Sequence, residues 1–154
     1  MRKIRFKPKL GQIDYTKAHW APVINCVLYY RGRILIVRRN KSLNFYPSYW
    51  NGISGFLDDA KNLKCKVEEE LKEELGMDKK QIKRIELREI FHQKAPKYNK
   101  MWIVHPVLVK IKTDKLKLNW EAGDYKWIRL KEVKNLKLMP GFNKVLEKVS
   151  SIIK

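Results

Sequence analysis

The segment KVEEELKEELGM, residues 66–77, limits the possible folds of this chain more than any other part of it. Apolar side chains recur around it at every fourth position: Leu63, Val67, Leu71 and Leu75. This spacing puts them on one side of an α-helix, so the helix needs an apolar surface to pack against. The pattern predicts a helix over residues 60–75, capped at its N-terminus by Asp58 or Asp59 and ended by Gly76.

Segments rich in β-branched and apolar residues surround this helix and predict a sheet. PVINCVLYY at 22–30 and RILIVRR at 33–39, separated by Arg31-Gly32, are typical of a hairpin. Further elements are predicted as strands at 84–93, 101–112 and 125–130 and as a helix at 139–153. The resulting order, ββ–α–ββ–β–α, favours an α+β fold in which a mixed sheet packs between two helices.

The length and composition of the chain fit one domain over residues 1–154. This is the usual size of a single core, and 44% of the residues are hydrophobic. The basic N-terminal stretch, 1–18, is expected to form an arm or an edge strand. No apolar run reaches the roughly 20 residues of a membrane helix, no signal peptide is recognisable, and the two cysteines form no disulfide framework or zinc spacing. These features favour a cytoplasmic protein that does not enter a membrane.

The chain carries a large excess of positive charge, with 35 Lys and Arg against 16 Asp and Glu and a net charge of +19. Such a balance favours contact with phosphates, either of a nucleotide or of an RNA backbone. A lysine-rich genome or the charged surface of a thermophile's protein would produce the same composition without such a partner. Both interpretations stay open on composition alone.

Three glutamates of the predicted helix, Glu70, Glu73 and Glu74, fall beside its apolar stripe within an arc of about 100°. Residues at this spacing lie roughly 5 to 6 Å apart, so the three carboxylates crowd together. One interpretation is a solvated face whose acids balance the neighbouring lysines. The other is a site for Mg²⁺ or Mn²⁺, because these cations bind converging oxygen ligands and bridge to substrate phosphates.

The residues around these glutamates resemble the Nudix box, G-x5-E-x7-R-E-U-x-E-E-x-G-U, in which U is a bulky aliphatic residue. Gly55 matches the first glycine, and the tail of the box matches in register at Glu70, Leu71, Glu73, Glu74, Gly76 and Met77. RGRILIVRR followed by Trp50 is similar to the family's hairpin and its tryptophan. Glu121, six residues before Trp127, is similar to a late element of the family. The resemblance therefore spans about residues 20 to 150.

The resemblance implies an α/β/α Nudix sandwich that binds divalent metal and hydrolyses a nucleoside diphosphate linked to another group, X. The implied ligands of Mg²⁺ or Mn²⁺ are the carboxylates of Glu70, Glu73 and Glu74 and the carbonyl group of Gly55. Metal ions at a diphosphate neutralise its charge and lower the pKa of an attacking water. The candidate general bases, which would accept the proton of that water, are Glu70 and Glu121.

Three positions depart from the family pattern. Lys61 stands where the box has its first glutamate and Glu69 stands where it has arginine, so the acid–base pair is reversed. An ion pair between Lys61 and Glu69 would still fasten the turn to the helix. Lys66 replaces a small residue one turn before Glu70. Its ammonium would either offset the carboxylates and compete with a metal ion, or turn outward and bind a substrate phosphate.

Further substrate contacts are predicted beside the presumed cleft. Arg38 and Arg39 end a strand there, and the one that points inward is a candidate for phosphate binding, because successive strand residues face opposite sides. Tyr46, Tyr49 and Trp50, in the loop before the box, are candidates for stacking on a base. The alternative is that Trp50 belongs to the core and the two tyrosines line its edge.

The predicted function is that of a Mg²⁺- or Mn²⁺-dependent Nudix-type pyrophosphohydrolase acting on a nucleotide or another small molecule that contains a diphosphate. A capped or triphosphorylated RNA 5′ end is a candidate substrate because of the basic composition. The alternative is a Nudix-like protein that binds RNA or a ribonucleoprotein with weak or no catalysis, favoured by the net charge and by Lys61, Lys66 and Glu69. Isomerase chemistry on an isoprenoid diphosphate is favoured least, since no cysteine stands in the loop before the box.

Overall fold

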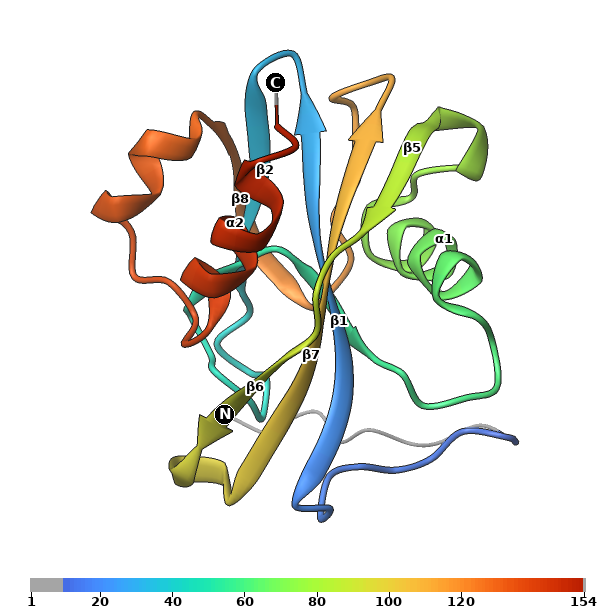
Figure 1. Cartoon of the computed structure of the whole chain (residues 1–154), viewed down its shortest axis with the longest axis vertical. Helices are drawn as coiled ribbons and strands as arrows, with labels where there is room; N and C mark the ends of the chain where they lie inside the picture. The colour runs from blue at the N-terminus through green and yellow to red at the C-terminus, as the bar shows by residue number, and fades with distance from the viewer. Residues whose placement is uncertain (1–9, 154) are drawn as a thin grey trace.

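A mixed β-sheet lies between two helices in the computed structural model, which describes residues 10–153 (Figure 1). The strands are β1 (Trp20–Tyr30), β2 (Arg33–Arg39), β3 (Trp50–Asn51), β4 (Ile53–Phe56), β5 (Ile82–Leu87), β6 (Phe91–Ala95), β7 (Lys100–Ile111) and β8 (Ala122–Ile128). The helices are α1 (Leu63–Leu75) and α2 (Phe142–Ser150), with short 3₁₀ turns at Lys79–Gln81, Pro96–Tyr98 and Leu130–Asn135. The α+β class with a mixed sheet between helices is therefore confirmed.

Strands β1 and β7 form the centre of the sheet and run parallel, from the pair Trp20–Met101 to the pair Tyr29–Lys110 (Figure 1). On the other side of β1, β4 pairs antiparallel with residues 23–26, and β2 pairs antiparallel at the opposite end. The turn between β1 and β2 has positive φ angles at Arg31 and Gly32, 46° and 80°, as a tight hairpin requires. β4, which contains Gly55, therefore pairs with the part of β1 whose residue Ile24 packs against α1.

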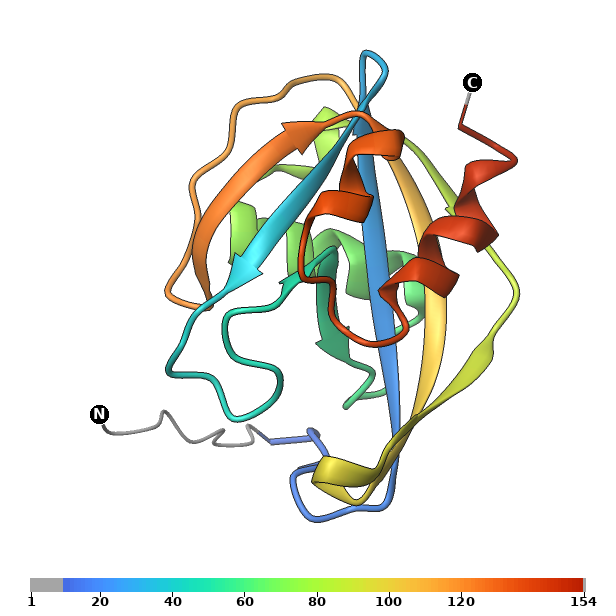
Figure 2. The same cartoon turned by 90° about the vertical axis from the view of Figure 1, so that its left-hand side faces the viewer.

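The two faces of the sheet carry separate apolar clusters, one under each helix. Val67, Leu71 and Leu75 of α1 pack with Ile24 and Leu28 of β1, and all five are buried. Alternate residues of the same strand point to the other face, where Val27 packs with Phe142, Val145 and Val149 of α2. Figure 2 shows the two helices on opposite sides of the central strands. The four-residue apolar stripe predicted for the first helix is thus its buried side.

The N-terminal cap of α1 differs from the prediction. The helix begins at Leu63 rather than at residue 60, and the Asn62 side chain accepts a hydrogen bond of 2.9 Å from the Cys65 amide. Asp58 and Asp59, the predicted caps, lie in the loop before it and form ion pairs with Lys66 instead. The predicted end is confirmed, because Gly76 adopts the left-handed conformation at φ 62°. Its amide donates hydrogen bonds to the carbonyl groups of Leu71 and Lys72.

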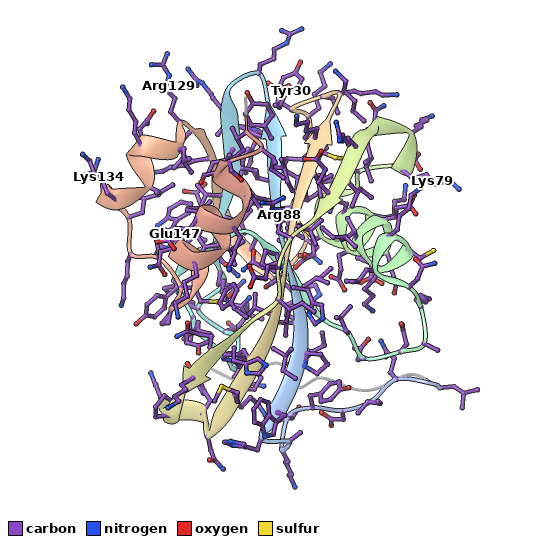
Figure 3. The ribbon with its side chains drawn as sticks, viewed as in Figure 1. Tyr30, Lys79, Arg88, Arg129, Lys134 and Glu147 are labelled. Atoms are coloured by element: carbon purple, nitrogen blue, oxygen red, sulfur yellow. The ribbon has the colours of Figure 1, made fainter. Side chains whose placement is uncertain are left out.

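The predicted strand at 84–93 is two strands, β5 and β6, which pair with different halves of β7. The change of partner falls at Pro106, which has no amide hydrogen to donate to a neighbouring strand. Arg88 lies in the gap, and its guanidinium donates to the Lys148 carbonyl of α2 at 2.9 Å (Figure 3). The strand predicted at 125–130 is β8, displaced toward the N-terminus, and α2 is shorter than the helix predicted at 139–153.

The predicted arm at 1–18 lies partly outside the described residues, which begin at residue 10. Its described part, 10–18, contains no strand, and it contacts the loop before α1 through a hydrogen bond of 2.7 Å from the Ile13 amide to the Asp58 carbonyl. Among residues 10–153, no helix is long and apolar enough to cross a membrane.

Candidate metal and substrate site

Gly55 of β4 lies directly against the carboxylate of Glu70 on α1. A Cβ atom at residue 55 would stand 2.5 Å from both Cδ and Oε1 of Glu70, closer than real contacts allow. Glycine at this position therefore makes room for the carboxylate, which is buried with 8% of the Glu70 residue exposed. The first glycine of the predicted site and one of its helix glutamates are adjacent.

Glu74 meets Glu121 at the C-terminal end of α1. The segment before β8 follows the end of the helix, because the Lys117 amide donates to the Leu75 carbonyl at 2.9 Å and the Asn119 amide donates to the Glu74 carbonyl at 3.0 Å. This path brings the carboxyl group of Glu121 within hydrogen-bonding contact of that of Glu74. Oε2 of Glu74 is buried without a hydrogen-bond partner. Two acids 47 residues apart in sequence thus share one end of the site.

Burial and mutual repulsion raise the pKa values of two of these carboxyl groups. Burial, together with the charge of Glu73, raises the pKa of Glu70 to about 8. Burial, the hydrogen bond with Glu121 and the charge of Glu70 raise the pKa of Glu74 well above its ordinary value. The guanidinium of Arg39 is close enough to oppose this rise at Glu74 but does not cancel it. A divalent cation among these oxygens would favour their ionised forms.

Lys66 is buried within the acidic side of the site. Its Nζ atom lies 3.0 Å from Asp58 Oδ1, 3.4 Å from Asp59 Oδ2, 3.8 Å from Glu69 Oε1 and 3.9 Å from Glu70 Oε1. Burial by itself would lower the pKa of Lys66, but the hydrogen bond to Asp58 and the surrounding negative charges outweigh it and raise the pKa above its ordinary value. Of the two orientations predicted for this side chain, the structure shows the inward one.

The reversed ion pair between Lys61 and Glu69 is present, as predicted, with 2.5 Å between Nζ and Oε2. It joins the loop before α1 to the helix. The Lys61 side chain is 52% exposed, so water screens the pair.

Replacing Lys61 with alanine is therefore expected to change the stability of the protein only slightly. Exposed ion pairs contribute little, because solvent screening and the entropy of ordering two long side chains offset their attraction. Urea denaturation of Lys61→Ala beside the wild type measures this. A loss as large as that of a core truncation would mean that the pair carries more of the fold than its exposure indicates.

The carboxylates suit Mg²⁺ or Mn²⁺ chemically, although they are not gathered around one point. Across residues 10–153, no three His, Cys, Asp or Glu side chains are arranged to hold a metal ion. The oxygens of Glu70, Glu73, Glu74 and Glu121 are nevertheless the hard donors that these cations prefer. Among residues 10–153, Oε2 of Glu74 has no hydrogen-bond partner, and the raised pKa values of Glu70 and Glu74 fit a site whose negative charge exceeds the positive charge that Lys66 and Arg39 supply. Metal binding would draw these side chains closer together.

A cavity of about 680 Å³ adjoins the acids. Its acidic side is formed by Asp58, Glu69, Glu70, Glu73 and Glu121. Its aromatic side is formed by Phe45, Tyr46, Phe56, Trp102 and Phe142. The ring NH of Trp102 donates to the Tyr46 hydroxyl at 2.9 Å, which fixes two of these rings relative to each other. The cavity lining therefore combines carboxylates with a large apolar surface.

The predicted substrate contacts lie in different places. Arg39 lines the cavity, and its Nε atom donates to the Phe45 carbonyl at 3.0 Å. Arg38 is exposed and is not among the lining residues, so Arg39 is the inward member of the pair. Tyr49 packs edge-on against Tyr46 outside the cavity lining, with the Lys137 ammonium 4.3 Å from its ring centroid. Trp50 is buried in the core.

Of the aromatic residues that line the cavity, Tyr46 was a predicted stacking residue, whereas Phe45, Phe56, Trp102 and Phe142 were not predicted. Trp102 and Val104 both line the cavity, and their spacing of two along β7 is the signal that places them on one face of a strand. That signal does not say which face points toward the glutamates. Asp58 is likewise a missed contact, because it was interpreted as a helix cap and instead binds Lys66.

A mixed sheet between two helices, with a glutamate-rich helix packed on a glycine of a short strand, defines the class to which this protein belongs. The chain is a member of the NUDIX domain family, whose sequence model matches residues 19–149. The family resemblance predicted from the box is thereby confirmed. Among curated proteins, no sequence matches this one.

Solved structures share the fold at low sequence identity. The NUDIX domain of Shewanella oneidensis NrtR, complexed with ADP ribose, has a TM-score of 0.72 and 17% identity over 88% of this chain and 89% of that one. A C. elegans Ap4A hydrolase binary complex has a TM-score of 0.68 and 20% identity over 86% and 97% of the two chains. A MutT protein from Methanosarcina mazei Go1 has a TM-score of 0.71 and 17% identity over 90% and 98%. At these identities the likeness establishes the fold.

Proposed function

We propose that the protein is a Mg²⁺- or Mn²⁺-dependent pyrophosphohydrolase that cleaves a nucleoside diphosphate linked to a further group. One arrangement carries this proposal: Glu70 packed on Gly55, with Glu74 against Glu121, beside a cavity that has an aromatic side. Acidic residues in such a place are unfavourable for stability, because their charges repel and are partly buried. Their presence is explained if they bind the cations that a diphosphate requires.

In this proposal, the carboxylates of Glu70, Glu73 and Glu74 and the Gly55 carbonyl would hold the metal. Bound Mg²⁺ would neutralise the diphosphate and make a water molecule more acidic. Glu121 or Glu70 would accept the proton from that water, as a carboxylate close to the reacting atoms can. Arg39 lines the same cavity as these glutamates and would bind a phosphate oxygen through its guanidinium.

The shape and lining of the cavity favour a compact nucleotide. Within residues 10–153, the basic residues of its lining are Arg39 and Lys66, and both already bind protein groups. A long polyanion would meet the acidic side, whereas a nucleoside would place its base against Phe45, Phe56 or Trp102. The ADP ribose bound to the NUDIX domain of NrtR is a ligand of this chemical class.

The test is phosphate release from a panel of nucleoside diphosphate-X compounds, with and without Mg²⁺ or Mn²⁺. Replacing Glu73 with glutamine is expected to reduce the metal-dependent rate by about tenfold or more, equivalent to at least about 1.4 kcal/mol of transition-state stabilisation. Glu147→Gln, at an exposed position of α2 labelled in Figure 3, is the matched control and is expected to retain the wild-type rate. Full metal-dependent turnover by Glu73→Gln would count against the proposal.

A second candidate is RNA or ribonucleoprotein binding with weak or no catalysis. The observation that favours it is the ammonium of Lys66 among the acids, where a divalent ion would otherwise compete for the same oxygens. Basic side chains project from both sides of the molecule, with Lys79 on one side and Arg129 and Lys134, which lie at the two ends of one short 3₁₀ turn, on the other (Figure 3). RNA binding that weakens steeply with salt would support this candidate, and weak binding without a salt dependence would reject it.

A further inference from the structure

Lys66 joins the two segments that form the acidic side of the site. Its own helix contributes Glu69 and Glu70, whereas Asp58 and Asp59 belong to the loop between β4 and α1. All four carboxylates lie within 3.9 Å of Nζ, and the Lys66 side chain is 3% exposed. A lysine can be buried to this extent only when several negative groups offset the loss of its hydration.

The distances around Nζ fit an ammonium better than a divalent ion. The closest contact, 3.0 Å to Asp58 Oδ1, is a normal hydrogen bond, and the others are 3.4 to 3.9 Å. Mg²⁺ requires oxygen ligands at about 2.1 Å in nearly octahedral geometry. The loop and the helix are therefore held apart at a spacing set by the lysine.

The partners of Lys66 also divide the acids of the site into two groups. Its ion pairs within 4 Å are with Asp58, Asp59 and the two helix residues Glu69 and Glu70, as far as the described chain extends. Glu74 pairs with Glu121 at the other end, where Oε2 of Glu74 has no partner. One end of the site thus has an ammonium within ion-pair distance, whereas at the other end the Arg39 guanidinium is near enough to act on Glu74 but forms no ion pair within 4 Å among residues 10–153.

We propose that Lys66 is a built-in cation of this site, whose ammonium takes the place of a divalent ion at the Asp58–Glu69 end. Removal of the ammonium would expose carboxylates that can bind one more divalent ion per chain. The metal ions of the proposed hydrolase would then bind at the Glu73–Glu74–Glu121 end, with Glu70, which interacts both with Lys66 and with Glu73, as a further ligand. The loop before α1 would stay fastened to the helix without metal. The assignment of metal to that second end rests on the proposed function.

The number of Mn²⁺ ions bound per chain tests the inference. Lys66→Met removes the ammonium and keeps a side chain of similar length, whereas Lys64→Met makes the same change at an exposed position of the same helix. Calorimetric titration, with free Mn²⁺ counted by electron paramagnetic resonance, is expected to find one more ion in Lys66→Met than in the wild type. Lys64→Met is expected to equal the wild type. Equal numbers in Lys66→Met and the wild type would overturn the inference.

The same titration separates the inference from the proposed function. The inference depends on the difference in the number of bound Mn²⁺ ions between Lys66→Met and the wild type. The proposed function depends on whether the wild type binds Mn²⁺ at all. Wild-type protein that binds no Mn²⁺ at millimolar concentration would reject the hydrolase. An additional ion in Lys66→Met would still support the role of Lys66 in that case.

A second measurement uses the wild type and decides the matter if Lys66→Met does not fold. Anomalous scattering from wild-type crystals grown with Mn²⁺ locates each ion directly. We expect no ion bonded to a carboxylate oxygen of Asp58 or Glu69, and Lys66 in its present position. An ion bonded to either residue, with the ammonium displaced, would overturn the inference.

Discussion

Replacing Gly55 with alanine is expected to reduce the rate of metal-dependent hydrolysis by about 100-fold or more while the protein stays folded. The added Cβ atom would stand 2.5 Å from Oε1 and Cδ of Glu70 and 2.8 Å from Oε2, so the carboxylate must move away. A displacement of about 1 Å is enough for a loss of this size, because catalytic groups act only in a narrow geometry. Gly55 does not have a left-handed φ, so the effect would come from the contact with Glu70 rather than from backbone strain.

Gly123→Ala is the matched control for this change. Its added Cβ atom would meet the Arg38 carbonyl oxygen at 3.8 Å, an ordinary van der Waals distance, and no atom of Glu70 is among its contacts within 4 Å. Steady-state rates and circular dichroism of both variants separate a local effect from unfolding. Wild-type activity in folded Gly55→Ala would show that the position of the Glu70 carboxylate does not matter for the reaction.

Replacing Glu70 with glutamine is expected to stabilise the metal-free protein at alkaline pH and to weaken its response to Mg²⁺. Burial and the charge of Glu73 raise the pKa of Glu70 from 4.5 to about 8. Between these two values the folded protein binds a proton that the unfolded chain has released, so the free energy of unfolding falls as the pH rises. This loss of folding stability is complete above about pH 8 and absent below about pH 4.5.

Glu70→Gln has no such proton to lose and avoids this penalty. Each unit of a pKa shift corresponds to about 1.4 kcal/mol, so the shift from 4.5 to about 8 leads us to expect the variant to be more stable than the wild type by several kcal/mol above pH 8. The two should be nearly equal at acidic pH. Saturating Mg²⁺ should reverse the order, because an ion that binds the folded wild type more tightly stabilises it more.

Denaturant unfolding across the pH range, with and without Mg²⁺, measures both effects. Glu147→Gln on α2 changes the same charge at an exposed position and serves as the control (Figure 3). Parallel stability curves for Glu70→Gln and the wild type at every pH would show that Glu70 ionises in the folded protein as it does in water. The raised pKa would then no longer support a cation site at this glutamate.

The local parts of the fold were predictable because each depends on neighbouring residues. The four-residue spacing of Val67, Leu71 and Leu75 predicted the buried side of α1, and Gly76 predicted its end. The tail of the box placed Glu70, Glu73 and Glu74 on one helix, and the paired exchange at Lys61 and Glu69 predicted the ion pair that the structure contains.

Competing local signals accounted for the errors. Asp58, Asp59 and Asn62 can all cap a helix. Asn62 is the cap of α1, because Asp58 and Asp59 form ion pairs with Lys66 instead. The split between β5 and β6 depends on Pro106, which lies in a different strand. The capping competitor lies within the same segment, whereas Pro106 is not visible when residues 84–93 are considered by themselves.

The sequence by itself determined the helix, its row of acids, the glycine that faces them and the family, because spacing along a chain dictates which side chains share a face. The tertiary structure decided that Lys66 points inward, that Arg39 rather than Arg38 faces the cavity, and that Glu121 meets Glu74. It also brought the aromatic residues and the acids into the lining of one cavity. These features depend on how strands and loops distant in sequence pack against α1, where burial and long-range charge outweigh local preference.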